Sequence, residues 1–125
     1  MEDFKYKDLT YKIIGCAMNV HNELGNGFQE VIYQRALAWE FNQANIDFVR
    51  EQNQEIFYKN CPEPIGTKRA DFVVESSVLV ELKATSSLTD VHYAQILNYL
   101  KAYRYEIGLL INFGHKKLEY KRFIL

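Results

Sequence analysis

One short segment, residues 78–84 with the sequence VLVELKA, is apolar on both of the faces that a strand would present. Alternate residues of a strand point to opposite sides, so a strand with one wet face shows apolar and polar residues in turn. A strand that is apolar on both faces is typical of a sheet that is covered on both sides. The rest of the chain must therefore supply a cover for each side of this strand.

Three segments have the three- and four-residue apolar spacing of amphipathic helices. The first runs from about residue 7 to 24, and the Gly-Asn-Gly sequence at 25–27 ends it because glycine tolerates the left-handed conformation of a helix stop. The second follows at about 28–45, where Asn45 offers a C-terminal stop. The third covers about 90–103, after Ser, Thr and Asp residues that can cap its N-terminus.

Extended segments account for most of the remaining chain. Residues 47–58 are predicted to form one long or interrupted strand, and residues 61–66, which hold both prolines, predict a surface connection. The later strands are predicted at 69–74, 78–84, 106–113 and 118–125, with a turn at Glu75-Ser76-Ser77 between the first two. The order α α β β β α β β indicates a single mixed α/β (α+β) domain over residues 1–125.

The composition fits one soluble domain. With 125 residues, of which 48% are hydrophobic and 25% charged, the chain can bury a core without a disulfide or a structural zinc. Cys16 is predicted in the core and Cys61 in a loop; they lack metal-ligand spacing and fit the reduced thiols of a cytoplasmic protein. The sequence shows no signal-peptide pattern and no run of 18 apolar residues, so no membrane association is expected.

The formal net charge of -1 hides an asymmetry along the chain. Residues 1–65 carry 6 Lys and Arg against 10 Asp and Glu, a balance of -4, whereas residues 66–125 carry 9 against 6, a balance of +3. A nucleic-acid partner would meet a local basic surface in the second part, although each of these side chains could equally belong to a solvated face. The candidates are Lys68, Arg69, Lys101, Arg104, Lys116, Lys117, Lys121 and Arg122.

Two charged residues, Glu81 and Lys83, interrupt the apolar strand at positions that share one face. Charged side chains are seldom fully buried unless they are paired or bind a metal. If the hairpin closes with Val74 opposite Val78, Asp71 stands opposite Glu81, with Cβ atoms about 5 Å apart. Two carboxylates so close repel each other, and a divalent cation is a natural way to satisfy both.

Oxygen ligands of this kind suit Mg²⁺ or Mn²⁺, and the backbone carbonyl of Leu82 could add one more. Such a metal would polarise a scissile phosphate, activate a water and stabilise the leaving oxygen, while Lys83 assists that water and balances the developing charge. The alternative is a structural ion pair between Glu81 and Lys83, with Asp71 capping a turn. The spacing alone does not decide between the two.

The spacing of Asp71 and residues 81–83 resembles the active-site signature of the PD-(D/E)XK nuclease superfamily. Residues 27–33, with the sequence GFQEVIY, match the motif of one branch, the GxxExxY family, and the resemblance runs from about residue 9 to the end. Ala70 stands where the superfamily name expects proline, which many branches lack. The resemblance implies a restriction-endonuclease-like mixed central sheet flanked by helices, with an αβββαβ core, an extra N-terminal helix and an extra C-terminal strand.

The resemblance also implies roles for single residues. Asp71 and Glu81 would be metal ligands and Lys83 the catalytic lysine. Glu30 matches the upstream helical acid of the superfamily, which assists the metal site directly or through water. A glutamate in the first turn of a helix could instead complement the helix dipole.

Further residues match the family outside the acidic set. Gln95 and Tyr99 match a Q-x-x-x-Y pattern of RecB-like branches; they lie four residues apart on one helix face, which could also be a solvated polar face. Tyr33 of the GxxExxY motif would shape the site, although a structural aromatic is the simpler interpretation.

The leading functional hypothesis is a metal-dependent nuclease that acts on DNA, with RNA as the alternative substrate. The alternative from another class is a nucleic-acid-binding or protein-interaction module on a nuclease-like scaffold, since fold analogy does not establish turnover. A purely structural domain ranks last, because it leaves the charged groups of the central strand unexplained. Cutting both strands of a duplex would be easiest for a two-fold dimer, so a homodimer is a further expectation.

Overall fold

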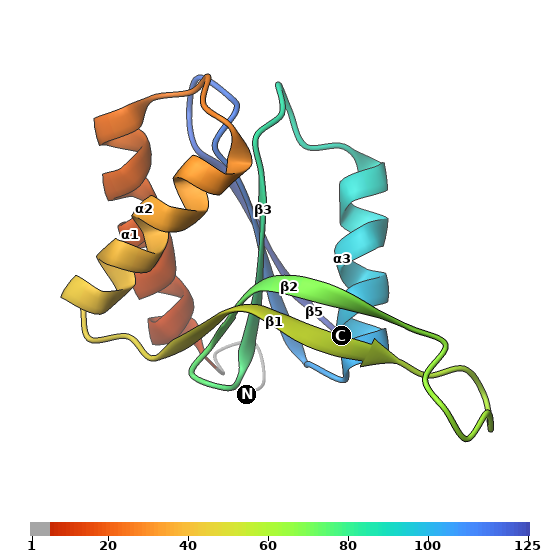
Figure 1. Ribbon diagram of the computed structural model, residues 1–125. Coiled ribbons are helices and arrows are strands. Elements are labelled where there is room, and N and C mark those ends of the chain that lie inside the picture. The colour runs from red at the N-terminus through yellow and green to blue at the C-terminus, as the bar shows by residue number, and fades with distance from the viewer. Residues whose placement is uncertain (1–5) are drawn as a thin grey trace.

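The structure, a computed structural model, describes residues 6–125 and contains three helices and five strands (Figure 1). No helix among these residues is both long and apolar enough to cross a membrane. The predicted order of elements is confirmed. The elements are α1 (Lys7–Leu24), α2 (Glu30–Gln43), β1 (Phe48–Ile56), β2 (Gly66–Val74), β3 (Val78–Lys83), α3 (Asp90–Tyr103), β4 (Ile107–Asn112) and β5 (Glu119–Ile124).

The strands form one mixed sheet in the order β1-β2-β3-β4-β5, with β3 at its centre. Neighbours along the chain pair antiparallel, except β3 and β4, which pair in parallel. Parallel neighbours need a crossover connection, and α3 provides it. The central strand is thus the one that the sequence singles out as apolar on both faces.

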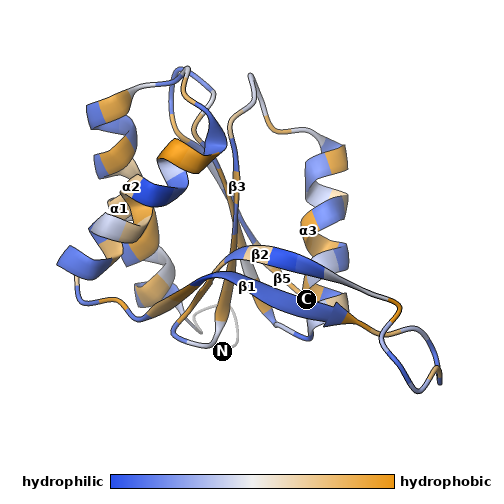
Figure 2. Cartoon of the chain, viewed as in Figure 1, coloured by the Kyte–Doolittle hydropathy of each residue, from blue (hydrophilic) through white to orange (hydrophobic). Residues whose placement is uncertain are grey.

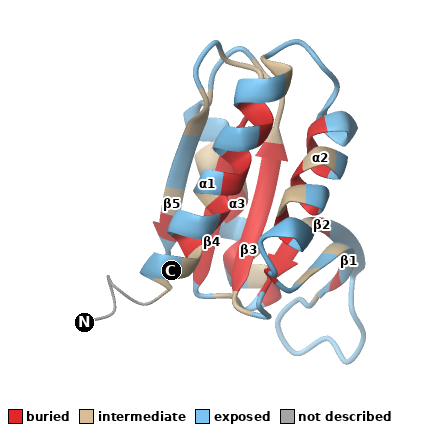
Figure 3. Cartoon of the chain, turned by 90° about the vertical axis from the view of Figure 1, so that its left-hand side faces the viewer, coloured by how far each residue is buried: buried red, intermediate tan, exposed pale blue. Residues whose placement is uncertain are grey.

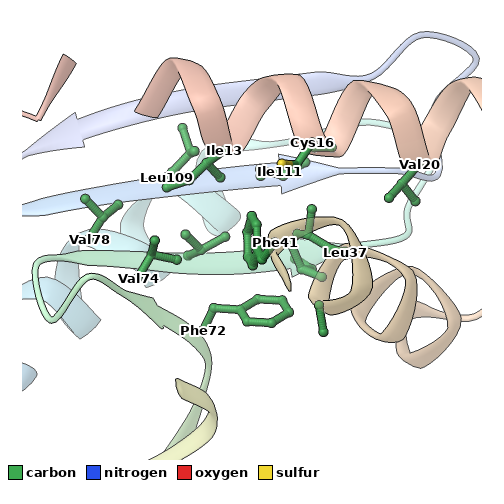
Figure 4. Packing of buried hydrophobic residues seen from close by; sticks show 14 of the residues in the cluster. Ile13, Cys16, Val20, Leu37, Phe41, Phe72, Val74, Val78, Leu109 and Ile111 are labelled. Carbon is green, nitrogen blue, oxygen red and sulfur yellow. The ribbon is translucent and has the colours of Figure 1, made fainter. Parts of the chain in front are cut away.

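Helices cover both sides of the sheet, α1 and α2 on one face and α3 on the other (Figures 1 and 3). The larger core lies under α1 and α2 and includes Val78, Val80 and Leu82 of β3 together with Leu37 and Phe41 of α2. Figure 4 shows part of this core. The smaller core lies under α3 and takes only Leu79 from β3. Burial on both faces confirms the interpretation of residues 78–84.

Two elements begin more than one residue away from their predicted starts. The second helix begins at Glu30 and not at residue 28, because Gly27 has φ 114° and the N–H of Phe28 is taken by the Tyr33 hydroxyl. The second strand begins at Gly66 and not at residue 69, because Gly66 and the two residues after it pair with β1 alone. This outer part of the β1–β2 hairpin is exposed and largely hydrophilic, so it has no apolar pattern (Figure 2).

Candidate active site

The strands β2 and β3 separate where their acidic residues lie. Their hairpin pairs Val74 with Val78, as predicted, and the pairing stops one step before Asp71 and Glu81. Strict alternation would place Ala70 under α1 and α2, yet it packs in the core under α3. The side-chain pattern of β2 therefore changes phase at Asp71.

A backbone distortion in β1 faces this point. Glu51 adopts φ 54°, a left-handed conformation that L-residues other than Asn and Asp rarely take, and the pairs on either side of it are Arg50–Phe72 and Gln52–Ala70. Asp71 thus lies opposite a kink on one side and a separating strand on the other. The Asp71 carboxylate takes the place of a backbone acceptor between β2 and β3, because the backbone N–H of Leu82 donates to Asp71 Oδ2 at 2.7 Å.

Two side chains in series hold the other oxygen of Asp71. Gln34 of α2, which is only 5% exposed, donates from Nε2 to Asp71 Oδ1 at 3.3 Å. Its own Oε1 accepts from Nε of Arg50 at 2.8 Å. Because a guanidinium can only donate, this contact fixes the orientation of the Gln34 amide, so that its NH₂ group must point to Asp71.

Gln34 and Arg50 were not predicted from the sequence. One signal was available for Gln34, since it lies four residues after Glu30 and hence on the same helix face. Arg50 had no such signal, because its place depends on the register of β1 on β2.

Glu81 is buried, with 6% of its surface exposed, and only one of its carboxyl oxygens has a partner. Its Oε2 accepts from the backbone N–H of Asp71 at 3.4 Å, whereas Oε1 is buried without a hydrogen bond from any residue that the structure describes. Burial, and after it the negative charge of Asp71, raises the pKa of Glu81 to about 9. Without a cation, this carboxyl therefore keeps its proton at neutral pH.

Lys83 does not pair with Glu81. Its Nζ donates to Oε1 of Gln95 on α3 at 2.8 Å, and within residues 6–125 no ion pair joins Lys83 to Glu81. The structural ion pair considered from the sequence is therefore wrong: the two side chains share a face, but α3 supplies the partner of the lysine. This contact also brings Gln95 into the site.

Glu30, the first residue of α2, lies within electrostatic reach of the same group. The residue is exposed, yet partial desolvation of its carboxyl and then the charge of Asp71 raise its pKa, while Lys83 and Lys68 act in the opposite direction. The side chain of Glu30 forms no hydrogen bond with another described residue, so its carboxylate is available to solvent or a ligand.

Tyr33 lies away from the acidic residues, fully buried in the core under α1 and α2. Its hydroxyl donates to Gly25 O at 2.5 Å and accepts from Phe28 N at 3.2 Å, and its ring stacks on Phe113 at 4.7 Å between centroids. These contacts fix the turn that leads into α2, whose first residue is Glu30.

Tyr99 extends the group along α3. Its ring stacks on Tyr103 with 5.4 Å between centroids, and Nζ of Lys68 lies 5.0 Å from the Tyr99 centroid. Burial and then the charge of Glu81 raise the pKa of Tyr103, whose hydroxyl is buried without a partner among residues 6–125. Tyr103 is a further neighbour of the site that was not predicted from the sequence.

The donors fit a hard divalent cation that keeps several waters. Among the described residues no three Asp, Glu, His or Cys side chains are grouped to hold a metal by themselves. Mg²⁺ is commonly bound through one or two carboxylates and completes its shell with water and phosphate oxygens. Asp71, the unpartnered Oε1 of Glu81 and the carbonyl of Leu82 provide such a set, and a cation would stabilise the ionised form of Glu81 that burial disfavours.

Comparisons with known proteins bear on the family and the fold. Residues 7–123 match the family model described as the PD-(D/E)XK nuclease superfamily, which distinguishes no branch within it. The crystal structure of SSO0001 is similar with a TM-score of 0.56 and 19% identity, over 76% of this chain and 50% of that one. This likeness shows the fold, which is of the restriction-endonuclease-like type, and the chain spans half the length of SSO0001. No curated protein matches the chain.

Proposed function

The chain belongs to the PD-(D/E)XK nuclease superfamily, and from this we propose that it is a metal-dependent nuclease that hydrolyses phosphodiester bonds of DNA, or of RNA, at Asp71, Glu81 and Lys83. The observation that carries the proposal is the buried carboxyl of Glu81, which has one unpartnered oxygen beside a second carboxylate. A purely structural strand gains nothing from such a group, because burying an unpaired polar atom is destabilising.

Asp71, Glu81 and the Leu82 carbonyl would hold Mg²⁺ or Mn²⁺, with Glu30 assisting directly or through water. When bound, such a cation polarises a phosphate oxygen and lowers the pKa of a bound water. Gln34 keeps Asp71 Oδ1 in place through the contact that Arg50 orients, and the Leu82 N–H holds Oδ2.

Lys83 has a separate task. Its ammonium is positioned by the hydrogen bond to Gln95. There it can hold the attacking water or balance negative charge on the transferring phosphate. Tyr99 and Lys68 lie further along α3 and β2, where an aromatic face under a cation fits contact with the nucleic acid.

Cleavage assays with metal test the proposal. The purified protein is incubated with single-stranded, double-stranded and branched DNA, and with RNA, in Mg²⁺, in Mn²⁺ and in EDTA. We expect cleavage only with metal, abolished in Asp71→Ala and Lys83→Ala and retained in Lys12→Ala, a matched control on the exposed surface of α1. Cleavage that persists in Asp71→Ala or Lys83→Ala would refute this site.

One observation favours a binding module without turnover as a second candidate. Both oxygens of Asp71 already accept hydrogen bonds from the protein, so the group can persist without a cation. Calorimetry separates the two candidates, since the module predicts no heat of Mg²⁺ or Mn²⁺ binding at millimolar concentration and the nuclease predicts binding that Glu81→Ala abolishes.

A further inference from the structure

Two hollows adjoin between the end of α3 and the β1–β2 hairpin, whose connecting loop projects past that helix (Figure 1). They measure about 290 and 340 Å³. Phe57, Ala102 and Arg104 line both hollows, so the two are neighbours, and together we call them the α3 groove.

The charged residues of the α3 groove are mostly positive. Lys59, Lys101 and Arg104 line it, and within residues 6–125 none of them forms an ion pair. Among the described residues that line it, Glu55 is the single acidic one. The balance favours an anionic ligand.

Buried polar atoms point the same way. The amide Nε2 of Gln54 and the hydroxyl of Tyr103 are buried without a hydrogen-bond partner in the described chain, and both residues line the smaller hollow. An amide NH₂ can only donate and a phenol can donate, so a ligand with acceptor oxygens would satisfy both.

One wall carries an aromatic ring with a free face. Phe57 is 52% exposed, and no other ring of residues 6–125 stacks on it. A nucleobase can stack on such a ring only if its own face is free, which is the case in a single strand and not inside a duplex.

The groove also leads to the candidate metal centre. Tyr103 lines the smaller hollow and stacks on Tyr99, over which Lys68 lies. One turn before Tyr99 on α3 is Gln95, whose Oε1 accepts from Lys83 Nζ. A strand lying in the groove would therefore continue along α3 toward Lys83.

We propose that the α3 groove binds a single-stranded segment of the nucleic acid beside the bond to be cleaved, with phosphates on Lys59, Lys101 and Arg104 and a base on Phe57. That the bound strand leads to a cleavage site rests on the proposed nuclease function. Binding in the groove can be measured without cleavage. The substrate class is thus a nucleic acid with an unpaired stretch, such as a single strand or a frayed or branched duplex.

Two of the basic residues allow variants that should not harm folding. Lys59 has φ 46° and Arg104, which ends α3, has φ 64°, and glycine adopts such conformations without a steric penalty. Lys59→Gly with Arg104→Gly thus removes two charges while relieving backbone strain, and the melting temperature reports on folding. Lys101→Ala and Lys12→Ala form a matched pair, since both remove an exposed helical lysine, one inside the groove and one on the opposite layer.

The experiment is fluorescence anisotropy in EDTA with a labelled oligothymidylate of about 12 nucleotides, its RNA counterpart and a duplex of equal length. We expect the single strands to bind more tightly than the duplex, and the glycine double variant to weaken binding by about tenfold or more. The slope of log Kd against log salt should fall by roughly 0.7 for each phosphate that the variant no longer neutralises. Phe57→Leu should weaken binding about tenfold with an unchanged slope, because it removes stacking and no charge.

Equal affinities of Lys101→Ala and Lys12→Ala together with an unaffected glycine double variant would overturn the inference, as would preference for the duplex or no binding of single strands. Tighter binding of DNA or of RNA tells which nucleic acid is preferred, and either result supports the inference when the variants weaken it. If the wild type binds as expected but never cleaves with Mg²⁺ or Mn²⁺, the proposed nuclease function fails and the groove stands. If it cleaves while groove variants bind like the wild type, the groove fails and the nuclease stands.

Discussion

The two faces of β3 differ in the side chains that they carry and in how these side chains are satisfied. Toward α1 and α2 it presents Val78, Val80 and Leu82 to a closed apolar core. Toward α3 it presents Leu79 and then Glu81, whose Oε1 lacks a partner among the described residues. The first face stabilises the fold by burial, and the second leaves polar groups unsatisfied, which is the usual mark of a site kept for a ligand. Changes on the first face should therefore affect stability, and changes on the second should affect ligand binding and pH dependence.

The largest expected effect lies on the closed face. Phe72 is fully buried there and contacts the rings of Phe41 and Phe48. Phe72→Ala should lower the free energy of unfolding by about 3–5 kcal/mol, because it removes buried apolar surface and leaves a cavity. Urea denaturation measures this, and a decrease below about 1 kcal/mol would show that the core collapses around the site and that the face is not closely packed.

An effect of opposite sign, whose size depends on pH, is expected from Glu81→Gln. The raised pKa of about 9 means that the folded protein keeps a proton which the unfolded chain, with its value near 4.5, loses first. The contribution of Glu81 to the stability of the metal-free wild type should thus be fully present below about pH 4.5. It should be lost as the pH rises toward 9. The slope is at most about 1.4 kcal/mol per pH unit.

Thermal melts of both proteins in EDTA between about pH 5 and 9 check this expectation. Glu81→Gln should lack the slope and be more stable than the wild type at the upper end. Added Mn²⁺ should raise the wild-type melting temperature more at high pH, because the cation displaces the proton, and leave Glu81→Gln unchanged. Parallel pH profiles for the two proteins would contradict the assignment.

Gln34→Leu tests how the hydrogen-bond partners of Asp71 contribute to metal binding. Removing the amide frees Asp71 Oδ1 and leaves Arg50 without its acceptor, so we expect Mn²⁺ affinity to fall by about 10- to 100-fold. Calorimetry measures it, with Arg50→Lys as the companion variant that keeps the charge but not the fork geometry. An unchanged Kd in both would show that Leu82 N–H alone positions Asp71.

The smallest expected effect is that of Tyr103→Phe. Its hydroxyl is buried without a partner in residues 6–125, so removing it should leave stability unchanged or raise it by up to about 1 kcal/mol. The same variant should weaken binding of single strands if the α3 groove holds them. A decrease of more than about 1 kcal/mol in denaturation would mean that the hydroxyl is satisfied and that the α3 face is less open than described.

Much of the fold could be predicted from periodicity. The apolar run at 78–84 required a covered central strand, and the turn at 75–77 predicted the register of Val74 on Val78. The phase change at Asp71 could not be predicted, because it depends on the kink at Glu51 in another strand. The outer part of β2 was missed for a related reason, since paired but solvated residues carry no apolar alternation.

The candidate site was predictable in its acidic residues and lysine but not in their partners. Glu81 and Lys83 stood out because charge interrupts an apolar strand, and the ion pair considered as the alternative to a metal site does not form, since Gln95 approaches from α3. Gln34, Arg50 and Tyr103 come from three different elements, and only their packing on the sheet brings them together. The GxxExxY assignment stays a prediction, and so do the roles of all the candidate site residues, Asp71, Glu81, Lys83, Leu82, Glu30, Gln95, Tyr99 and Tyr33.

The most direct test of the central claim is a crystal structure of the wild-type protein soaked with Mn²⁺. We expect anomalous density between Asp71 and Glu81, with Oε1 of Glu81 among the ligands at about 2.1 Å and most remaining positions filled by water. Absence of density there at millimolar Mn²⁺, with Glu81 Oε1 still unpartnered or bonded to another protein group, would contradict the assignment of this group as a metal site.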